Sequence, residues 1–177
     1  MIKKSLILLI GVVLLASVLT AGCTANVGNT TPSASPTNTY DSANFTIKYP
    51  SDWTKNEPTS GPITVLFGTP TNNATENLNV QVYPSGETLS DLTARLTSQL
   101  QNFSDFKQID AGNTTLAGNP AYKVVYTATI DGGQLKLMQI WTVKDGKEYI
   151  ITYKGAPNNY DTYLSAAQQM IDSFQIK

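Results

Sequence analysis

The sequence predicts an α+β domain, in which an antiparallel sheet of about six or seven strands carries at least two helices. Three observations support this fold class. Several short segments alternate apolar and polar residues, which is the period of a half-buried strand. Tight-turn signals join the last three of these segments, which is typical of an antiparallel meander. Two longer segments place apolar residues three or four positions apart, which is the period of an amphipathic helix.

The first three predicted strands precede the first helix. Residues 45–49 alternate apolar and polar side chains, and Pro50 ends the segment. Residues 63–67 and 78–83 form the second and third strands, and each is followed by Gly and Pro residues that interrupt a strand. We therefore expect a sheet that begins near Phe45.

The segment 88–103 changes to helical spacing. Thr88 is placed to cap the helix, and Asp91 follows three residues later as in a capping box. The apolar stripe is formed by Leu89, Leu92, Leu96, Leu100 and Phe103.

The central region predicts more strands. Residues 106–111 read as a strand followed by a turn at Gly112-Asn113, and residues 114–116 lead to a second turn at Gly118-Asn119. Residues 121–130, 135–143 and 148–154 then form the meander, whose hairpin turns lie at Asp131-Gly132-Gly133 and Asp145-Gly146.

A second helix is predicted to close the chain. Asn158 or Asn159 is placed to cap it, and it extends to about Phe174. Its apolar stripe is formed by Tyr163, Leu164, Ala167, Met170, Ile171 and Phe174.

The first 22 residues have the features of an export signal. Lys3 and Lys4 precede an almost unbroken apolar run from Leu6 to Leu19, and small residues lead to Cys23. Ala21-Gly22-Cys23 resembles a lipobox, which implies that Cys23 receives a lipid and becomes the mature N-terminus. An uncleaved membrane anchor and ordinary secretion are the alternatives. The apolar run is short for an anchor, because a spanning helix usually takes about 20 residues.

The chain therefore divides into a signal peptide at 1–22, a lipidated Cys23 with a flexible linker to residue 39, and a folded domain at 40–177. Residues 24–39 are rich in Ser, Thr, Asn and Pro and carry no charge, so they cannot bury enough surface to fold. We expect a domain on the extracytoplasmic face of the membrane, held there by the lipid.

Composition excludes several function classes. The 177 residues include one Cys and no His, so the chain has no internal disulfide and no His-based triad or metal site. There are 12 basic and 13 acidic residues, and loss of Lys3 and Lys4 with the signal leaves a net charge of −3. Because nucleic-acid binding needs clustered Lys and Arg, we expect no nucleic-acid partner.

No motif for catalysis is present. The chain lacks a Gly-x-Ser-x-Gly elbow, a Ser-x-x-Lys pair, a phosphate-binding Gly loop and EF-hand spacing. We therefore predict a protein that is not an enzyme and needs no metal or cofactor, although acids brought together by folding would form an alternative catalytic site. Five Asn-x-Ser/Thr sequons offer N-glycosylation sites or reflect a composition rich in Asn and Thr; they are Asn29, Asn44, Asn73, Asn102 and Asn113.

Four segments resemble the PsbP-like family. Residues 45–53 follow its Phe-x-x-x-Tyr-Pro-x-x-Trp pattern, and residues 117–122 resemble its Gly-x-Pro-Ala-Tyr segment before the central strands. Residues 147–153 and 170–174 resemble its late strand and its final helix. The resemblance implies an α/β/α sandwich, and it covers about residues 40–177. The family includes an extrinsic subunit of photosystem II that helps to retain metal ions. Because this chain has no His, the resemblance does not lead us to expect metal binding here.

Three functions remain open at this point. A binding or accessory domain with a protein partner at the membrane is the first. A small-molecule or glycan binder is the second, and Trp53 and Trp141 are its candidate binding residues, although strand aromatics more often pack in a core. A carboxylate-based enzyme is the third. We do not expect the sequence to identify the partner or the oligomeric state.

Overall fold

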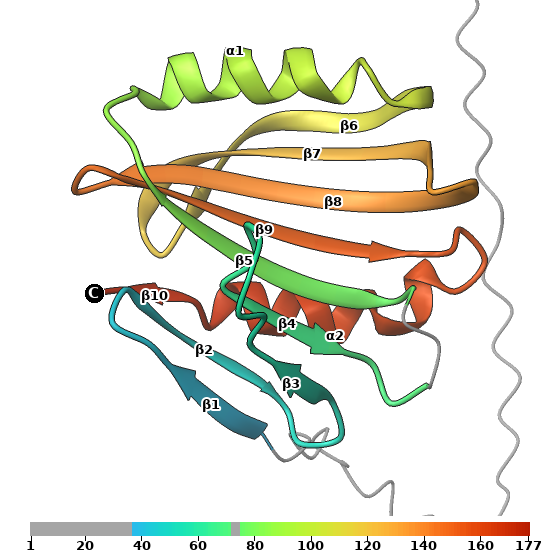
Figure 1. Ribbon diagram of the computed structural model, residues 1–177, viewed down its shortest axis with the longest axis horizontal. Coiled ribbons are helices and arrows are strands. Elements are labelled where there is room, and N and C mark those ends of the chain that lie inside the picture. Colours follow the sequence, from blue (N-terminus) through green and yellow to red (C-terminus); the bar gives the residue numbers. More distant parts are fainter. Residues whose placement is uncertain (1–36, 72–74) are drawn as a thin grey trace, which may run out of the picture. The chain divides into compact units, whose positions relative to one another are not determined.

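The computed structural model describes residues 37–71 and 75–177 (Figure 1). These residues form an α+β fold with a seven-stranded antiparallel sheet, a three-stranded sheet and two helices. The large sheet has the order β3 (Thr54–Asn56), β4 (Val65–Gly68), β5 (Asn77–Pro84), β9 (Lys147–Gly155), β8 (Gly133–Lys144), β7 (Asn119–Ile130) and β6 (Ser104–Leu116). The small sheet has the order β1 (Thr37–Asp41), β2 (Phe45–Pro50) and β10 (Gln175–Ile176).

The two helices lie on opposite sides of the long strands (Figure 1). Helix α1 (Leu89–Leu100) packs on β7 and β8, and its core cluster includes Leu92, Tyr126 and Trp141. Helix α2 (Tyr160–Asp172) packs mainly against β9 and β2 on the other side. The predicted α+β fold with a helix layer on each face of the sheet is therefore confirmed, and the small sheet shares the α2 side through Phe45 and Ile47.

The helix ends follow the predicted caps in part. The Thr88 hydroxyl accepts from the Asp91 backbone N–H at 3.2 Å and donates to the Asp91 carboxylate at 2.7 Å. Asn159 occupies the N-cap position of α2, but its side chain makes no capping hydrogen bond. Instead, the Glu76 carboxylate accepts from the Ala156 N–H at 3.3 Å in the loop before α2.

The prediction that the strand at 106–111 ends in a turn was wrong. Strand β6 runs without interruption from Ser104 to Leu116, and the predicted turn at Gly112-Asn113 is paired in register with Lys123 and Tyr122 of β7. From Asp110 to Leu116, every residue of β6 has a partner in β7, so tertiary pairing overrides the local turn preference.

The folded domain also begins earlier than predicted. Strand β1 starts at Thr37, inside the expected linker, and pairs with the Pro50 end of β2. Only Tyr40 of β1 is buried, so this edge strand has no alternating pattern that the sequence could reveal. No helix among the described residues is long and apolar enough to span a membrane.

Candidate binding grooves beside helix α2

Helix α2 leaves part of the large sheet uncovered. It packs near β9 and β2, whereas β6 and β7 lie farther along the sheet. A groove of about 640 Å³ lies between α2 and these strands; we call it the α2 groove. Its apolar surface is formed by Ile109, Val125, Met138 and Leu164.

A β-bulge produces the most exposed side chain of this groove. Gln108 pairs with Tyr126 and Asp110 pairs with Val125, so Ile109 has no residue opposite it. A bulge of this kind re-aims side chains. Ile109 therefore lines the groove on the α2 side with 53% of its surface exposed, which is the largest exposure of any large hydrophobic residue described.

Two ion pairs border the apolar surface. The Lys123 ammonium lies 3.0 Å from the Asp110 carboxylate, and the Lys136 ammonium lies 3.1 Å from the Asp161 carboxylate. The Lys136 ammonium also lies 4.3 Å from the centre of the Tyr160 ring. The border thus carries two positive and two negative groups around an apolar centre.

Tyr160 forms the wall of the α2 groove nearest the helix start. Its side chain is buried, and its hydroxyl has no hydrogen-bond partner among the described residues. Burial raises the pKa of this phenol above its ordinary value, and Asp161 adds to the increase. The Tyr153 hydroxyl donates to the Tyr160 carbonyl at 2.6 Å and fixes the first turn of α2 on the sheet.

The hollow continues toward the other end of α2. A second groove of about 380 Å³ shares Lys123 and Gln168 with the first and is floored by Ile140 and Leu116. The two together form one strip along the same side of α2.

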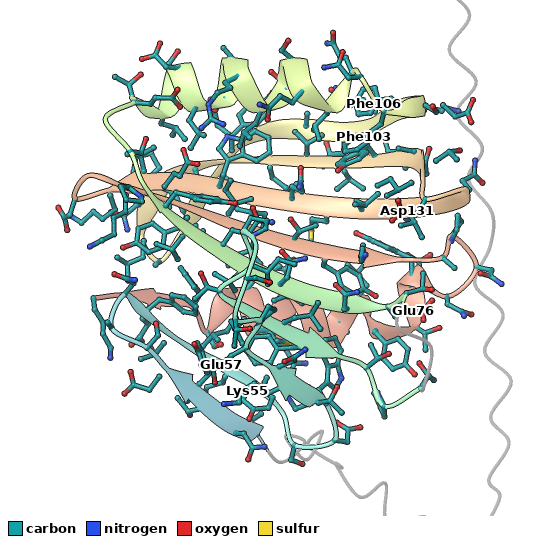
Figure 2. The ribbon with its side chains drawn as sticks, in the orientation of Figure 1. Lys55, Glu57, Glu76, Phe103, Phe106 and Asp131 are labelled. Atoms are coloured by element: carbon teal, nitrogen blue, oxygen red, sulfur yellow. The ribbon has the colours of Figure 1, made fainter. Side chains whose placement is uncertain are left out.

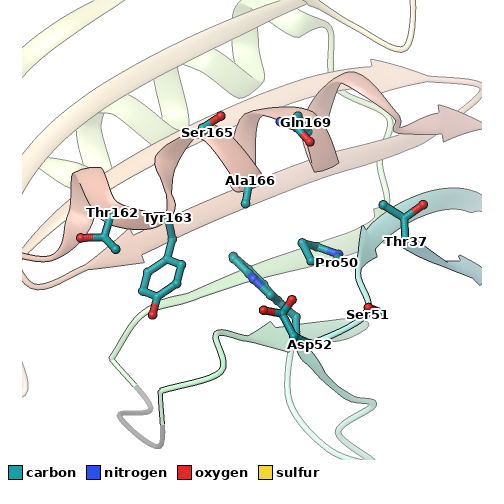
Figure 3. A pocket seen from close by; sticks show the side chains of 10 residues that line it. Thr37, Pro50, Ser51, Asp52, Thr162, Tyr163, Ser165, Ala166 and Gln169 are labelled. Carbon is teal, nitrogen blue, oxygen red and sulfur yellow. The ribbon is translucent and has the colours of Figure 1, made fainter. Parts of the chain in front are cut away.

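A third cavity also borders α2 and shares Ser165 and Gln169 with the α2 groove. This cavity of about 530 Å³, which we call the Trp53 pocket, lies between α2 and the segment after β2 (Figure 3). Figure 3 shows Tyr163 projecting from α2 on the side that faces Asp52. Trp53 is 5% exposed and meets the Tyr163 ring edge-on, with ring centres 6.1 Å apart. The pocket therefore combines an aromatic wall with polar lining residues such as Asp52 and Thr162.

Trp141, the other candidate binding residue, lies in the core under α1. It is fully buried, and its indole N–H donates to the Thr93 hydroxyl at 2.9 Å. The Tyr122 ring packs against it at 5.6 Å between centres. Its position is that of a packing residue, and the structure does not bring the two tryptophans together, since they lie in different core clusters.

The described sequons occupy different environments. Asn102 is exposed just after α1, Asn113 is exposed on β6, and Asn44 is half-buried in the turn between β1 and β2. Cys23, Asn29 and Asn73 lie outside the described residues.

Folding brings two acids together at one place on the α1 side. Arg95 contacts Glu87 at 3.0 Å and Glu148 at 2.7 Å, and the hydrogen bond that Arg95 donates to the Glu87 carboxylate is the main reason that the Arg95 pKa is raised. This arrangement ties α1 to β9. Among residues 37–71 and 75–177 there is no group of three or more acidic or Cys side chains that could hold a metal ion.

Sequence reasoning missed the α2 groove. Its bulge depends on the pairing of β6 with β7, which no local pattern reveals. Figure 2 shows the other exposed large hydrophobic residue, Phe103, on the α1 side beside Phe106. The sequence shows Ile109 as an apolar residue between Gln108 and Asp110, but it does not show that the Ile109 side chain is exposed.

Comparisons with known proteins fit this fold. The family described as "PsbP-like protein" matches residues 6–176. CyanoP, the cyanobacterial PsbP of Synechocystis sp. PCC 6803, has a similar structure, with a TM-score of 0.60 and 20% identity over 88% of this chain and 98% of that chain. LpqN of Mycobacterium tuberculosis, which is involved in cell envelope biogenesis, gives a TM-score of 0.59 at 12% identity over 81% and 87% of the two chains. No curated protein matches the sequence.

Proposed function

We propose that this chain, which belongs to the PsbP-like family, is a membrane-anchored extracytoplasmic binding domain without catalytic activity. Lys3, the apolar run and Cys23 support export and lipid attachment. The structural similarity to LpqN, which is involved in cell envelope biogenesis, is consistent with this location. Attachment through Cys23 holds the domain beside the proteins of the membrane.

The exposed Ile109 over the α2 groove is the observation that carries the binding role. Protein interfaces concentrate their binding energy in apolar centres surrounded by polar residues. The α2 groove has this composition, because Val125 and Leu164 are apolar while Lys123 and Lys136 border them. We therefore assign the protein partner to this face.

The size of the surface predicts a weak interface. Strands of 12 or 13 residues extend about 40 Å, and two neighbouring strands are about 10 Å wide, so the strip offers on the order of 400 Å². A standard interface buries about 800 Å² on each partner. Binding through this strip would be transient in solution, and attachment of both partners to one membrane would favour it.

Site-specific photo-crosslinking in native membranes tests this function. A photoreactive amino acid replaces Ile109 in the intact lipoprotein, and the control places it at Ser98, an exposed position on α1. We expect a protein adduct from position 109 and none from position 98. Equal adducts from both positions, or none from either, would refute the assignment. A Cys23→Ser variant, expected to leave the membrane fraction, tests the anchor separately.

The Trp53 pocket supports a second candidate function, the binding of a small polar molecule such as a glycan. An aromatic wall with convergent polar groups is typical of such sites. Titration of the intact protein with short oligosaccharides, followed by tryptophan fluorescence, tests it. Ligand-dependent changes should disappear in Trp53→Phe and persist in Trp141→Phe, because Trp141 is fully buried. An unchanged spectrum at millimolar ligand would exclude the saccharides tested.

A further inference from the structure

The α2 groove carries a protruding side chain and a recess on one surface. Ile109 projects from the bulge of β6, and the recess beside it is floored by Val125 and Met138 and closed by Leu164. A symmetric dimer uses the same patch on both subunits, so such a patch must contain both halves of each contact. A surface with both features meets this requirement.

The border charges are also self-complementary. Lys123 with Asp110 and Lys136 with Asp161 give the border two cations and two anions. A strongly acidic or basic partner would meet like charges on half of this border. A second copy, rotated by a two-fold axis, brings the same two cations and two anions to the contact. The charge pattern therefore favours a copy of the same chain over a partner of one charge.

The edge of the sheet disfavours a different mode of self-association. Strand β6 is an edge strand, which would otherwise be a template for strand addition. Its pairing is irregular between Ser104 and Lys107 and again between Gln108 and Asp110. Bulges and charged residues are common means of blocking edge-to-edge pairing. The contact therefore uses the face of the sheet and not its edge.

We propose that the α2 groove binds a second copy of this chain, with Ile109 of each copy inserted over Val125 and Met138 of the other. This inference rests on the proposed binding function of the same face and names its partner. Because the strip is small, the dimer forms on the membrane, where tethering raises the effective concentration of one copy near another.

Disulfide trapping between two differently tagged full-length copies tests the proposal. One copy carries Ile109→Cys and the other carries Leu164→Cys. The sequence contains no Cys besides Cys23, which the lipid occupies, so each variant adds one free thiol. Under mild oxidation in membranes, we expect a mixed disulfide several-fold above that formed with Ser98→Cys in place of either variant. Equal yields in all three pairings would overturn the proposal.

A matched pair of charge variants gives a second measurement. Energy transfer between labelled lipoproteins on neutral phosphatidylcholine vesicles should fall to the random level for Ile109→Glu. It should stay at the wild-type level for Gln108→Glu, which adds the same charge at the adjacent exposed residue. Gln108 is paired with Tyr126, whose side chain lies in the core under α1 and not in the α2 groove. Equal transfer in both variants would contradict the proposed contact. Both variants lie at exposed positions, so thermal melting should show a folded domain.

The two proposals fail in different ways. A photo-adduct at position 109 that contains another protein, together with no disulfide between copies, overturns the second-copy inference and leaves the binding function in place. No adduct of any kind at position 109 overturns both.

Discussion

Replacing Thr93 by Val should destabilise the domain by leaving the buried Trp141 indole N–H without an acceptor. The Thr93 hydroxyl accepts this hydrogen bond at 2.9 Å, and Trp141 is fully buried. Val has nearly the shape of Thr and a similar helix propensity. An unpaired buried donor costs about 1–3 kcal/mol, so the substitution should lower the free energy of unfolding by about that amount.

The expected change in melting temperature follows from domain size. The domain at residues 37–177 is longer than 100 residues and shorter than 150. At this size, a loss of about 1 kcal/mol in the free energy of unfolding lowers the melting temperature by about 3–4 °C. Thr93→Val should therefore lower it by about 3–12 °C. Urea unfolding followed by circular dichroism, with calorimetry as a second probe, measures both quantities.

Thr97→Val on the same helix is the matched control. The Thr97 hydroxyl donates to the Thr93 carbonyl at 2.7 Å, a bond within the helix that adds little stability. Its effect should be within about 0.5 kcal/mol. The double variant Thr93→Val with Trp141→Phe should be no less stable than Trp141→Phe alone, because the unpaired donor is gone. Equal stability of Thr93→Val and Thr97→Val would refute the reasoning.

Three further predictions concern the stability of the domain. Arg95→Ala should cost about 1–3 kcal/mol in urea unfolding, because it leaves the largely buried Glu148 carboxylate unpaired, and an unchanged midpoint would contradict this. Gly155→Ala should destabilise the domain by about 1–3 kcal/mol, because the added Cβ would lie 3.3 Å from the Tyr160 Cα at the start of α2. Gly86→Ala is the control and should be nearly neutral, because open space surrounds Gly86. Burial raises the pKa of Tyr126, so on raising the pH the unfolded chain loses the phenol proton before the folded chain does. The free energy of unfolding should therefore fall above about pH 10, by up to about 1.4 kcal/mol per pH unit. Tyr126→Phe should show a shallower decline in alkaline melting curves, and an identical slope would be evidence against it.

Local periodicity was sufficient to predict the elements with the clearest patterns. The Leu stripe of α1 and the alternation of residues 121–130 both place their apolar residues in the core that the structure shows. The Thr88 cap was also predicted correctly. In these segments the local preference and the tertiary environment agree.

Elements defined by pairing alone could not be predicted in this way. Strand β1 is mostly polar, and β3 and β10 have three and two residues, so their hydrogen bonds come from neighbouring strands. Gly112-Asn113 has the composition of a turn but lies within β6.

The candidate site depends on such non-local features. The exposure of Ile109 follows from a bulge in the β6–β7 register and from the absence of a described segment over that half of the sheet. Trp53 and Trp141 lie in different environments because they are on different sides of the sheet. Trp53 packs in the core beside α2, and Trp141 packs in the core under α1. The sequence offered both as candidate binding residues and could not show which side of the sheet each one reaches.

Hydroxyl-radical footprinting of the lipoprotein in native membranes tests most directly the claim that the α2 groove is covered by a partner. Ile109 is 53% exposed and Phe103 is 39% exposed, and they lie on opposite sides of the sheet, so Phe103 serves as the internal control. Relative to dilute protein in detergent, the oxidation rate of Ile109 in membranes should fall several-fold, while that of Phe103 should be unchanged. Equal oxidation of Ile109 in both states, or protection of Phe103 instead, would contradict the assignment of this face as the binding surface.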